Sequence, residues 1–517
     1  MALGALLLIG VFFYWPVARI VALGLSGTDE VSFPWTRLLE VAWFTVWQAA
    51  VSALGSVAIG LVFAYLLFRR IGPAWWLWRA AVLVPFTLPV IVLAIGMHTF
   101  QIENVLSGTT LIIATHILIN ASVATRLLGS AWQSLDSHTE DAAALDGAGR
   151  WRTFRSVSLP QLLPSVAASA LLTFAFSASS FGVVLLLGDV GTDTLETLIY
   201  KVTTGYLDLR GAAWLALVQL AIVGLTFGLG RGWRQLQLSP DAEQRQRRLD
   251  RRDSPVAAVG LLLGLLAAAP LASIAVQAFW DGSAWSLQNF ANLASNGERQ
   301  LLNASVWQAL GNSARNAGLV AVAATTLGTA TAYLAARTRN LWLGNMLNLA
   351  YTLPLAVSTV VLGFGYLITF DTEPLALRET WLVVPVAQTL LALPLVVNLM
   401  TNAFAGMSRE LLEAASSEGA NTWQRLRWVE LPLVAPAIGT AAAFSAAVAL
   451  GDFGASSFLA YGDQETLPQV LFRLMSRPGP TNFGMAMAAA VVLTLLITAV
   501  MALAGLRKPL AKADRRI

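Results

Sequence analysis

The sequence predicts an all-α membrane protein of about twelve transmembrane helices, arranged as two parallel six-helix repeats. Two observations predict this fold class. The 517 residues are 56% hydrophobic and only 12% charged, and apolar segments long enough to cross a bilayer recur along nearly the whole chain. In addition, short motifs of the first half return in the second half in the same order.

The apolar segments that we expect to span the membrane fall into two sets. The first set lies near 2–25, 41–68, 78–100, 109–129, 161–188 and 212–231, and the second near 255–279, 309–336, 343–370, 381–405, 432–460 and 481–505. The stretch Met1–Leu25 lacks the basic start and the small-residue cleavage site of a signal peptide. We therefore expect it to remain as the first spanning helix.

The placement of lysine and arginine predicts the orientation of these spans. With the N-terminus inside, most of the 33 basic residues fall in the inner loops and the C-terminal tail. Because basic loops stay on the cytoplasmic side, both termini are expected to be cytoplasmic. The stretch 235–254 is the one long polar segment, and it is expected to be a solvated, charged cytoplasmic linker between a first repeat at 1–234 and a second at 255–517. Its arginines have anionic lipid as an alternative partner.

A shift of about 272 residues relates the two halves. Because six spans per half is an even number, the copies run parallel, and a transport pathway is expected at their interface. The recurring pairs are Ala64-Tyr65-Leu66 with Ala332-Tyr333-Leu334, Thr87-Leu88-Pro89 with Thr352-Leu353-Pro354, Leu159-Pro160 with Leu431-Pro432, Phe181-Gly182 with Phe453-Gly454, and Thr194-Leu195 with Thr466-Leu467.

The loop after the fourth span of each half carries a shared pattern of an acid, two alanines, a glycine, a tryptophan and a proline. We expect a short helix with the acid near its start, a left-handed glycine turn, a second short helix, and proline at the start of the next span. A loop with this much structure predicts docking to a soluble partner. Its residues are Asp141, Ala142, Ala143, Gly147, Trp151 and Pro160 in the first half, and Glu413, Ala414, Ala415, Gly419, Trp423 and Pro432 in the second.

This pattern resembles the EAA loop in permease subunits of bacterial ABC importers, which forms a coupling helix that inserts into the ATPase subunit. The first copy departs from the family pattern because Asp141 replaces glutamate, with Glu140 just before it, so either acid could make the family contact. Two permease units in one chain are similar to the fused permeases for thiamine and for ferric iron. The segment Gly451-Asp452-Phe453-Gly454 looks more like the thiamine type.

The resemblance implies a type I ABC importer-like permease in the bacterial cytoplasmic membrane, surrounded by lipid. Its expected partners are two copies of a cytoplasmic ABC ATPase and an extracytoplasmic substrate-binding protein. Thiamine is the expected substrate, with ferric iron as the alternative. A secondary transporter of the major-facilitator kind would also have twelve spans in parallel halves, but it would need intramembrane charges for ion coupling. A membrane scaffold without a transport role is a further alternative.

The chain lacks the sequence signatures of thiolate sites, of zinc sites with paired histidines and of nucleotide binding. It has no cysteine, its three histidines are scattered, and no lysine follows a glycine as a P-loop requires. We therefore expect a non-catalytic translocation subunit with no metal or cofactor of its own, and ATP and Mg²⁺ would bind the separate ATPase. The net charge of +4 lies in membrane-flanking loops and gives no sign of nucleic-acid binding.

Polar residues inside apolar segments are the candidates for the translocation pathway, and these are His116, Asn398 and Asp452. For His116 and Asn398 the alternative is hydrogen bonding between helices. For Asp452 the alternative is an acid at the outer interface that water stabilises.

Overall fold

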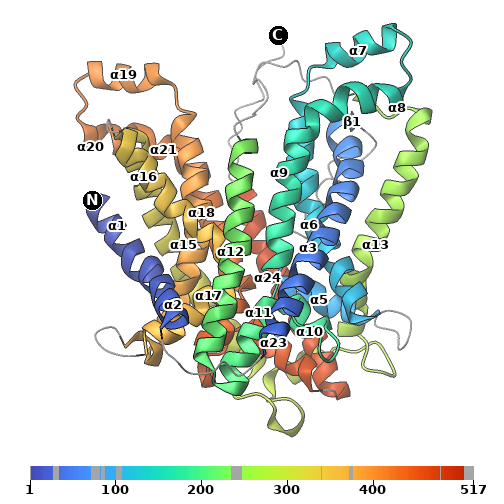
Figure 1. The fold of residues 1–517 in the computed structure, drawn as a ribbon, viewed down its shortest axis with the longest axis vertical. Helices are drawn as coiled ribbons and strands as arrows, with labels where there is room; N and C mark the ends of the chain where they lie inside the picture. The colour runs from blue at the N-terminus through green and yellow to red at the C-terminus, as the bar shows by residue number, and fades with distance from the viewer. Residues whose placement is uncertain are drawn as a thin grey trace. The chain divides into compact units, whose positions relative to one another are not determined.

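Helices make up nearly all of the computed structural model (Figure 1), which describes residues 2–26, 34–71, 78, 82, 88–100, 107–234, 247–338, 341–371, 376–477 and 479–505. The chain divides into two compact units. Unit 1 comprises Met1–Thr28 and Ser286–Ile517, and unit 2 comprises Asp29–Trp285.

Unit 2 is built on the long helices α3, α6, α9 and α12, which pack against one another. Its short elements lie at the ends of these helices, and the two-residue strands β1 and β2 pair in parallel. The elements are α3 (Trp35–Ala64), η2 (Tyr65–Arg69), β1 (Arg70–Ile71), α5 (Val90–His98), α6 (Gly108–Gln133), α7 (Ser137–Leu145), α8 (Arg150–Thr153), η3 (Phe154–Ser158), α9 (Leu159–Ala178), α10 (Gly182–Leu187), α11 (Leu195–Lys201), η4 (Val202–Tyr206), α12 (Leu209–Arg234), β2 (Arg247–Arg248), η5 (Arg251–Asp253) and α13 (Ser254–Ala278).

Unit 1 repeats this plan with the long helices α15, α18, α21 and α24. Its elements are α1 (Ala2–Ile9), η1 (Gly10–Tyr14), α2 (Trp15–Leu25), α14 (Gln288–Ala291), η6 (Asn292–Ala294), η7 (Glu298–Gln300), α15 (Val306–Arg337), α16 (Leu341–Thr352), η8 (Leu353–Ala356), α17 (Thr359–Thr369), η9 (Leu377–Glu379), α18 (Val383–Ala405), α19 (Arg409–Ser417), α20 (Thr422–Arg425), η10 (Leu426–Glu430), α21 (Leu431–Gly451), α22 (Gly454–Leu459), η11 (Gly462–Gln464), α23 (Leu467–Ser476) and α24 (Pro480–Gly505).

One glycine in each unit lets the two central helices approach closely. A Cβ on Gly60 of α3 would lie 2.6 Å from the Cβ of Ala124 on α6, and a Cβ on Gly328 of α15 would lie 2.5 Å from Val396 on α18. Small residues at such crossings are the usual way in which membrane helices pack without a hydrophobic driving force. The two contacts occupy equivalent positions of the sequence repeat, so the structure confirms the repeat at the level of packing.

The helices α11 and α23 also hold equivalent places, and each begins with a capping box that satisfies its first backbone N–H groups. A buried acid just before each helix pairs with a basic residue within it. The Nζ of Lys201 lies 2.7 Å from Asp193, and Arg473 lies 2.5 Å from Glu465. The same charge pair is therefore kept in both repeats, although the residue types differ.

The compact units differ from the sequence repeats by the exchange of one helix. Helix α2 packs against α17 in unit 1, and α13 packs against α5 in unit 2. Glycines permit both contacts, since a Cβ on Gly365 would lie 3.2 Å from Pro16, and a Cβ on Gly96 would lie 2.7 Å from the carbonyl oxygen of Pro270. The division at 235–254 marks the repeats along the sequence, whereas each folded unit includes the first helix of the other repeat.

Across the described residues, ten helices are long and apolar enough to cross a membrane, against the twelve spans expected. The difference lies in the third segment of each repeat. The expected span at 78–100 falls partly outside the described residues, and its described helix α5 covers only Val90–His98. The expected span at 343–370 is broken at Leu353-Pro354 between α16 and α17. Proline causes such a break because it lacks an N–H and restricts the residue before it.

Candidate functional site

Each of the two patterned loops forms two short helices joined by a tight turn, as the sequence predicts. The expectation of an acid near the helix start is wrong for Asp141 and Glu413, which each lie at the middle of the first short helix. The first loop consists of α7, a turn and α8, and the second consists of α19, a turn and α20. Figure 1 shows α7 and α19 each projecting beyond the long helices of its own unit. The short helices are therefore placed where a soluble partner can reach them.

The glycine in each turn adopts the left-handed conformation that the sequence predicts, with φ of +79° at Gly147 and +84° at Gly419. The backbone N–H after each glycine closes the helix end, from Ala148 to the carbonyl of Ala143 at 3.0 Å and from Ala420 to that of Ala415 at 3.1 Å. A Cβ on either glycine would meet no atom within 4 Å. The backbone conformation, rather than lack of space, is therefore what requires glycine here.

The paired alanines lie at the C-terminal half of α7 and α19. Ala142 and Ala414 are exposed, while Ala143 and Ala415 are half-buried and supply the carbonyls that close the turns. The exposed pair leaves a small-residue surface that another backbone can approach.

The second short helix of each loop continues into the next span, which corrects the expectation of a separate spanning helix that starts at proline. The helix runs unbroken from Arg150 to Ala178 and from Thr422 to Gly451. A wider π turn, η3 or η10, precedes Pro160 and Pro432. The wider turn explains the continuity, because proline has no N–H to donate and its ring would collide with the preceding carbonyls of a regular α-helix.

Large apolar side chains on both loops are open to the surroundings. Trp151 and Trp423 are 71% and 63% exposed, and Leu145, the last residue of α7, is 90% exposed. The Trp151 ring packs against Phe154 with a centroid separation of 5.7 Å, and most of the side chain stays exposed. Exposed aromatic residues at a helix end suit a protein partner.

The acids of the two loops differ in their surroundings. In unit 2, Glu140 forms an ion pair with Arg69 and accepts a hydrogen bond of 2.9 Å from the Ser158 hydroxyl. Asp141, the next residue, is half-buried, and Glu413 in the second loop is exposed. Glu140 therefore ties α7 to the end of α3, whereas Asp141 and Glu413 share the position in the repeat.

The structure separates the three pathway candidates. His116 is buried, with Nδ1 3.0 Å from the Gln48 side-chain oxygen. Asn398 is exposed on α18 and accepts a hydrogen bond of 3.3 Å from Asn402. His116 belongs to unit 2, whereas Asn398 belongs to unit 1.

Asp452 is only 6% exposed, so its interpretation as an acid that water stabilises is wrong. It occupies the break between α21 and α22, a break that the single expected span at 432–460 did not include. Its carboxylate accepts hydrogen bonds from the backbone N–H groups of Ala455 and Ser456, at 3.2 and 3.1 Å, and from the Gln388 side chain at 3.2 Å. Asp452 therefore holds the start of α22 in place against α18.

Sequence reasoning missed the ion pairs that hold the loops to the long helices. Glu430, which is fully buried, binds both Arg337 and Arg425. Arg69 and Arg337 occupy equivalent repeat positions, so the recurrence of arginine at the end of α3 and α15 was the signal that could have identified these pairs. The acids that pair with these two arginines lie at different positions of the repeat, since the residue equivalent to Glu430 in the first half is Ser158.

Two repeats of membrane-spanning helices, each with an exposed helical loop, define a two-unit membrane permease. The family of binding-protein-dependent transport system inner membrane components matches residues 56–233 and 324–510, once in each repeat. The chain belongs to this family, and it is a multi-pass protein of the inner membrane. A permease of this kind works with a substrate-binding protein and an ATPase.

Several curated proteins are similar over most of the chain. The chain is 27% identical to the thiamine transport system permease protein ThiP of Brucella abortus (strain 2308), over 94% of this chain and 91% of that protein. It is 28% identical to ThiP of Escherichia coli (strain K12), over 84% and 83%. It is 26% identical to FbpB 1 of Haemophilus influenzae, a protein assigned to ferric transport, over 70% and 58%.

Proposed function

We propose that this chain is the non-catalytic translocation subunit of an ATP-driven importer for thiamine. The observation that carries the substrate is the likeness to thiamine permeases, which extends over 94% of the chain in one relative and 84% in another. The relative assigned to ferric transport is matched over 70% of the chain, so ferric iron is the second candidate substrate.

The two loops are the proposed docking sites for two copies of the ATPase, one on α7–α8 and one on α19–α20. The exposed Trp151 and Trp423 and the exposed alanines of each first helix supply the apolar part of the contact. Closure of the ATPase pair on ATP would move both loops, and the long helices that continue from α8 and α20 would carry this motion into the membrane.

The docking acid of the first loop is assigned to Asp141 instead of Glu140. Glu140 already binds Arg69 and Ser158 inside unit 2, and Asp141 shares its repeat position with the exposed Glu413. Asp141→Asn should lower the amount of ATPase retained on the immobilised permease, and Glu413→Gln should do the same. Glu140→Gln should instead lower thermal stability while ATPase retention at low temperature stays near wild type. Equal loss of ATPase in all three variants would contradict the assignment.

The orientation that we propose places both termini, the charged linker and both loops in the cytoplasm, where the ATPase acts. The excess of basic residues in the inner loops supports this orientation. Lipid surrounds the apolar faces of the spans. A cysteine-free chain makes the test direct, since single cysteines at Leu145 and Val190, both exposed, can be probed with a membrane-impermeant maleimide. Labelling of Leu145→Cys from the outside of intact cells would overturn the orientation.

Asn398 is the proposed pathway residue. The exposed amide pair Asn398 and Asn402 lies in the C-terminal third of the apolar helix α18, and exposed amides are costly against hydrocarbon. The pair is therefore better placed beside a water-filled path. His116 and Asp452, which are buried and hydrogen-bonded, are proposed to shape the helices along the path.

The test of the proposed function is uptake into proteoliposomes that contain the permease, its ATPase and ATP, with the binding protein outside. Labelled thiamine should accumulate, uptake should stop with vanadate, and an uncoupler should leave it unchanged. Accumulation of ferric iron without thiamine would show that ferric iron, and not thiamine, is the substrate. Uptake that an uncoupler stops and vanadate does not would identify a secondary transporter.

A further inference from the structure

We propose that Asp253 clasps the end of the linker to the first docking loop, so that α13 moves together with that loop. Asp253 acts as a positioning residue, and among the described residues no equivalent acid joins the second loop to a following segment. The effect on transport rests on the proposed function, whereas the clasp itself is a property of unit 2 alone.

The clasp is built around one buried carboxylate. Asp253 is 2% exposed and accepts hydrogen bonds from the Tyr65 hydroxyl at 2.7 Å and from Nη1 of Arg150 at 2.8 Å. The Nε of Arg70 lies 3.5 Å from its other oxygen, which also accepts the backbone N–H of Asp250 at 2.9 Å. Three parts of unit 2 therefore meet at this one acid. They are the end of α3 with η2 and β1, the first docking loop, and the end of the linker.

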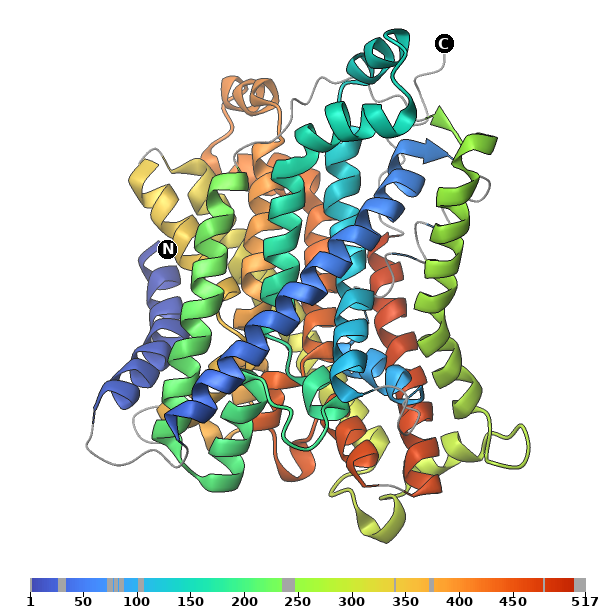
Figure 2. The ribbon, with the colours of Figure 1, turned by 45° about the vertical axis from the view of Figure 1, so that its right-hand side comes forward.

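The linker also joins unit 2 through its backbone. Strand β2 pairs with β1, with Arg247 opposite Arg70 and Arg248 opposite Ile71. Figure 2 shows β1 as an arrow that ends beside the start of α13. The expectation of a solvated connector is wrong for Asp253, which is buried, while Arg248, Asp250 and Arg251 are exposed as a solvated connector would be. Residues 235–246 lie outside the described residues.

The clasp connects the docking loop to a membrane helix of the other repeat. Arg150 is the first residue of α8, and Asp253 directly precedes Ser254, the first residue of α13. Along its length α13 packs against α5, where Gly96 allows the Pro270 carbonyl to approach. A movement of the first loop is thus transmitted to α13 through the Arg150–Asp253 pair as well as to α9 through the continuous helix.

The residues that bind Asp253 are only partly kept in the second half of the chain. Arg150 and Arg70 align with Thr422 and Thr338 in the second half, so both guanidiniums that bind Asp253 are missing there. Tyr65 does recur, as Tyr333, but its ring packs against Phe404 instead. In the part of the chain that the structure describes, the two docking loops are therefore held by different residues, and the contact with the linker is made by the first loop.

The test is pulsed EPR on the full-length permease without ATPase, using the absence of native cysteine to place spin labels. One label pair, at Leu145 and Val259, measures the distance from the first loop to α13. A second pair, at Ser417 and Leu433, measures the distance from the second loop to α21. All four residues are exposed, and Leu145 and Ser417 are the last residues of α7 and α19.

Arg150→Gln carries the test because the Arg150 side chain is 45% exposed, so this variant should fold even where Asp253→Asn does not. The population outside the wild-type distance peak of the first pair should rise about tenfold, the factor for loss of one charge-assisted hydrogen bond. Asp253→Asn should have a similar effect, and the double variant should not exceed the larger single effect. The matched control, Arg152→Gln, changes an exposed arginine on the same helix and should leave the distribution unchanged.

An unchanged first pair in Arg150→Gln, or equal broadening of the second pair, would overturn the clasp. In complexes with ATPase, the clasp variants should hydrolyse more ATP per substrate imported than Arg152→Gln does. An unaltered ratio would show that the clasp holds the loop without contributing to coupling, and would overturn that part of the proposal. A wild-type permease that binds no ATPase would instead refute the proposed function, while the EPR result would stand.

Discussion

Arg337 donates two hydrogen bonds to one carboxylate oxygen of Glu430, from Nε at 3.0 Å and from Nη2 at 2.8 Å. The other oxygen accepts a bond of 2.9 Å from Nε of Arg425. One buried acid thus joins the end of α15 to α20 and fixes the base of the second loop. In the first repeat, Arg69 holds the equivalent position and pairs with Glu140 of α7. An arginine at this position therefore anchors the loop in both repeats, but through a different element in each.

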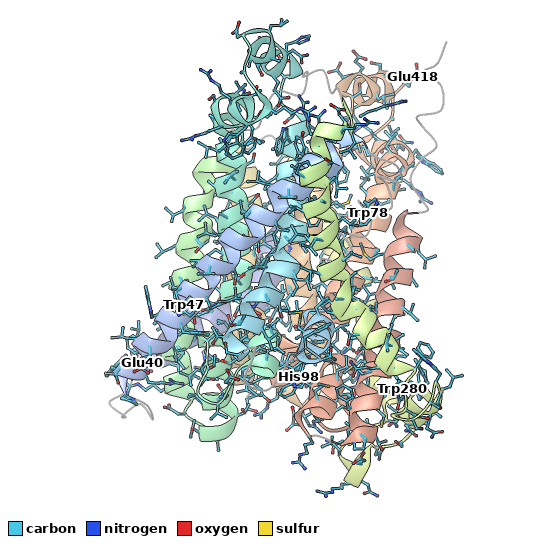
Figure 3. All side chains as sticks on the ribbon, turned by 90° about the vertical axis from the view of Figure 1, so that its right-hand side faces the viewer. Glu40, Trp47, Trp78, His98, Trp280 and Glu418 are labelled. Atoms are coloured by element: carbon cyan, nitrogen blue, oxygen red, sulfur yellow. The ribbon has the colours of Figure 1, made fainter. Side chains whose placement is uncertain are left out.

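Loss of Glu430 should destabilise unit 1 strongly. Glu430→Ala leaves two guanidiniums without their partner, and breaking a buried ion pair in this way costs about 3 kcal/mol or more. Thermal unfolding in detergent should show a clearly lower midpoint. The matched control is Glu418→Ala at the exposed turn of the second loop (Figure 3), which should leave the midpoint within error. Equal midpoints for the two variants would contradict the anchoring role of Glu430.

Alanine at Gly419 should weaken coupling more than it weakens folding. The left-handed φ of +84° costs an L-residue about 1 kcal/mol, and the strain falls at the end of α19. Uptake per ATP hydrolysed should fall while the amount of protein in the membrane stays constant. Gly406→Ala, at a nearby position without positive φ, is the control. Normal uptake in Gly419→Ala together with a normal ATP cost would show that this turn has no part in coupling.

Asp452 should tolerate asparagine and not alanine. Asparagine keeps a side-chain oxygen that can accept the backbone N–H groups of α22, whereas alanine removes the cap at a cost of about 1 to 2 kcal/mol. Asp452→Asn should therefore retain most of the thiamine uptake in proteoliposomes, and Asp452→Ala should lose both stability and uptake. Complete loss of uptake in a stable Asp452→Asn protein would show that the negative charge itself acts in transport.

The clasp should open only in acid. Burial opposes the charge on Asp253, but hydrogen bonds from the Asp250 backbone and Tyr65, and the charges of Arg70 and Arg150, outweigh it and lower its pKa below the ordinary 3.8. A depressed folded-state pKa gives a contribution that is complete above the unfolded value and is lost as pH falls through the folded value. The Leu145–Val259 distance distribution should thus stay constant from about pH 8 to about pH 5 and broaden only below about pH 4. Broadening near neutral pH would contradict a lowered pKa.

The sequence predicts those features that local chemistry or the repeat determines. Gly147 and Gly419 could be placed in left-handed turns because each follows a short helical run, and the repeat could be recognised because glycine and proline pairs return in register. It does not predict which helix joins which compact unit, since α2 and α13 are as apolar as their neighbours and packing partners decide their place. Asp253 was equally hidden, because its partners lie about 100 and about 190 residues away along the chain.

The break at Leu353-Pro354 shows a middle case. The Thr-Leu-Pro motif could be seen in both repeats, but the apolar composition on both sides of it predicted one continuous span. Asp452 is similar, because the expected span at 432–460 was a single unbroken helix. Burial of an acid at a helix break depends on the hydrogen bonds that meet it there, and these come from α18 as well as from α22.

The most direct test of the central claim is affinity purification of the tagged chain from its native membrane, with quantitative mass spectrometry of the proteins that accompany it. Two copies of one ABC ATPase should accompany each chain, and the double variant Trp151→Ala and Trp423→Ala should lose most of that ATPase while it remains folded. No ATPase with the wild-type chain, under conditions that preserve other transport complexes, would contradict the docking role of the two loops. Full recovery of ATPase with the double variant would contradict the assigned contact surface.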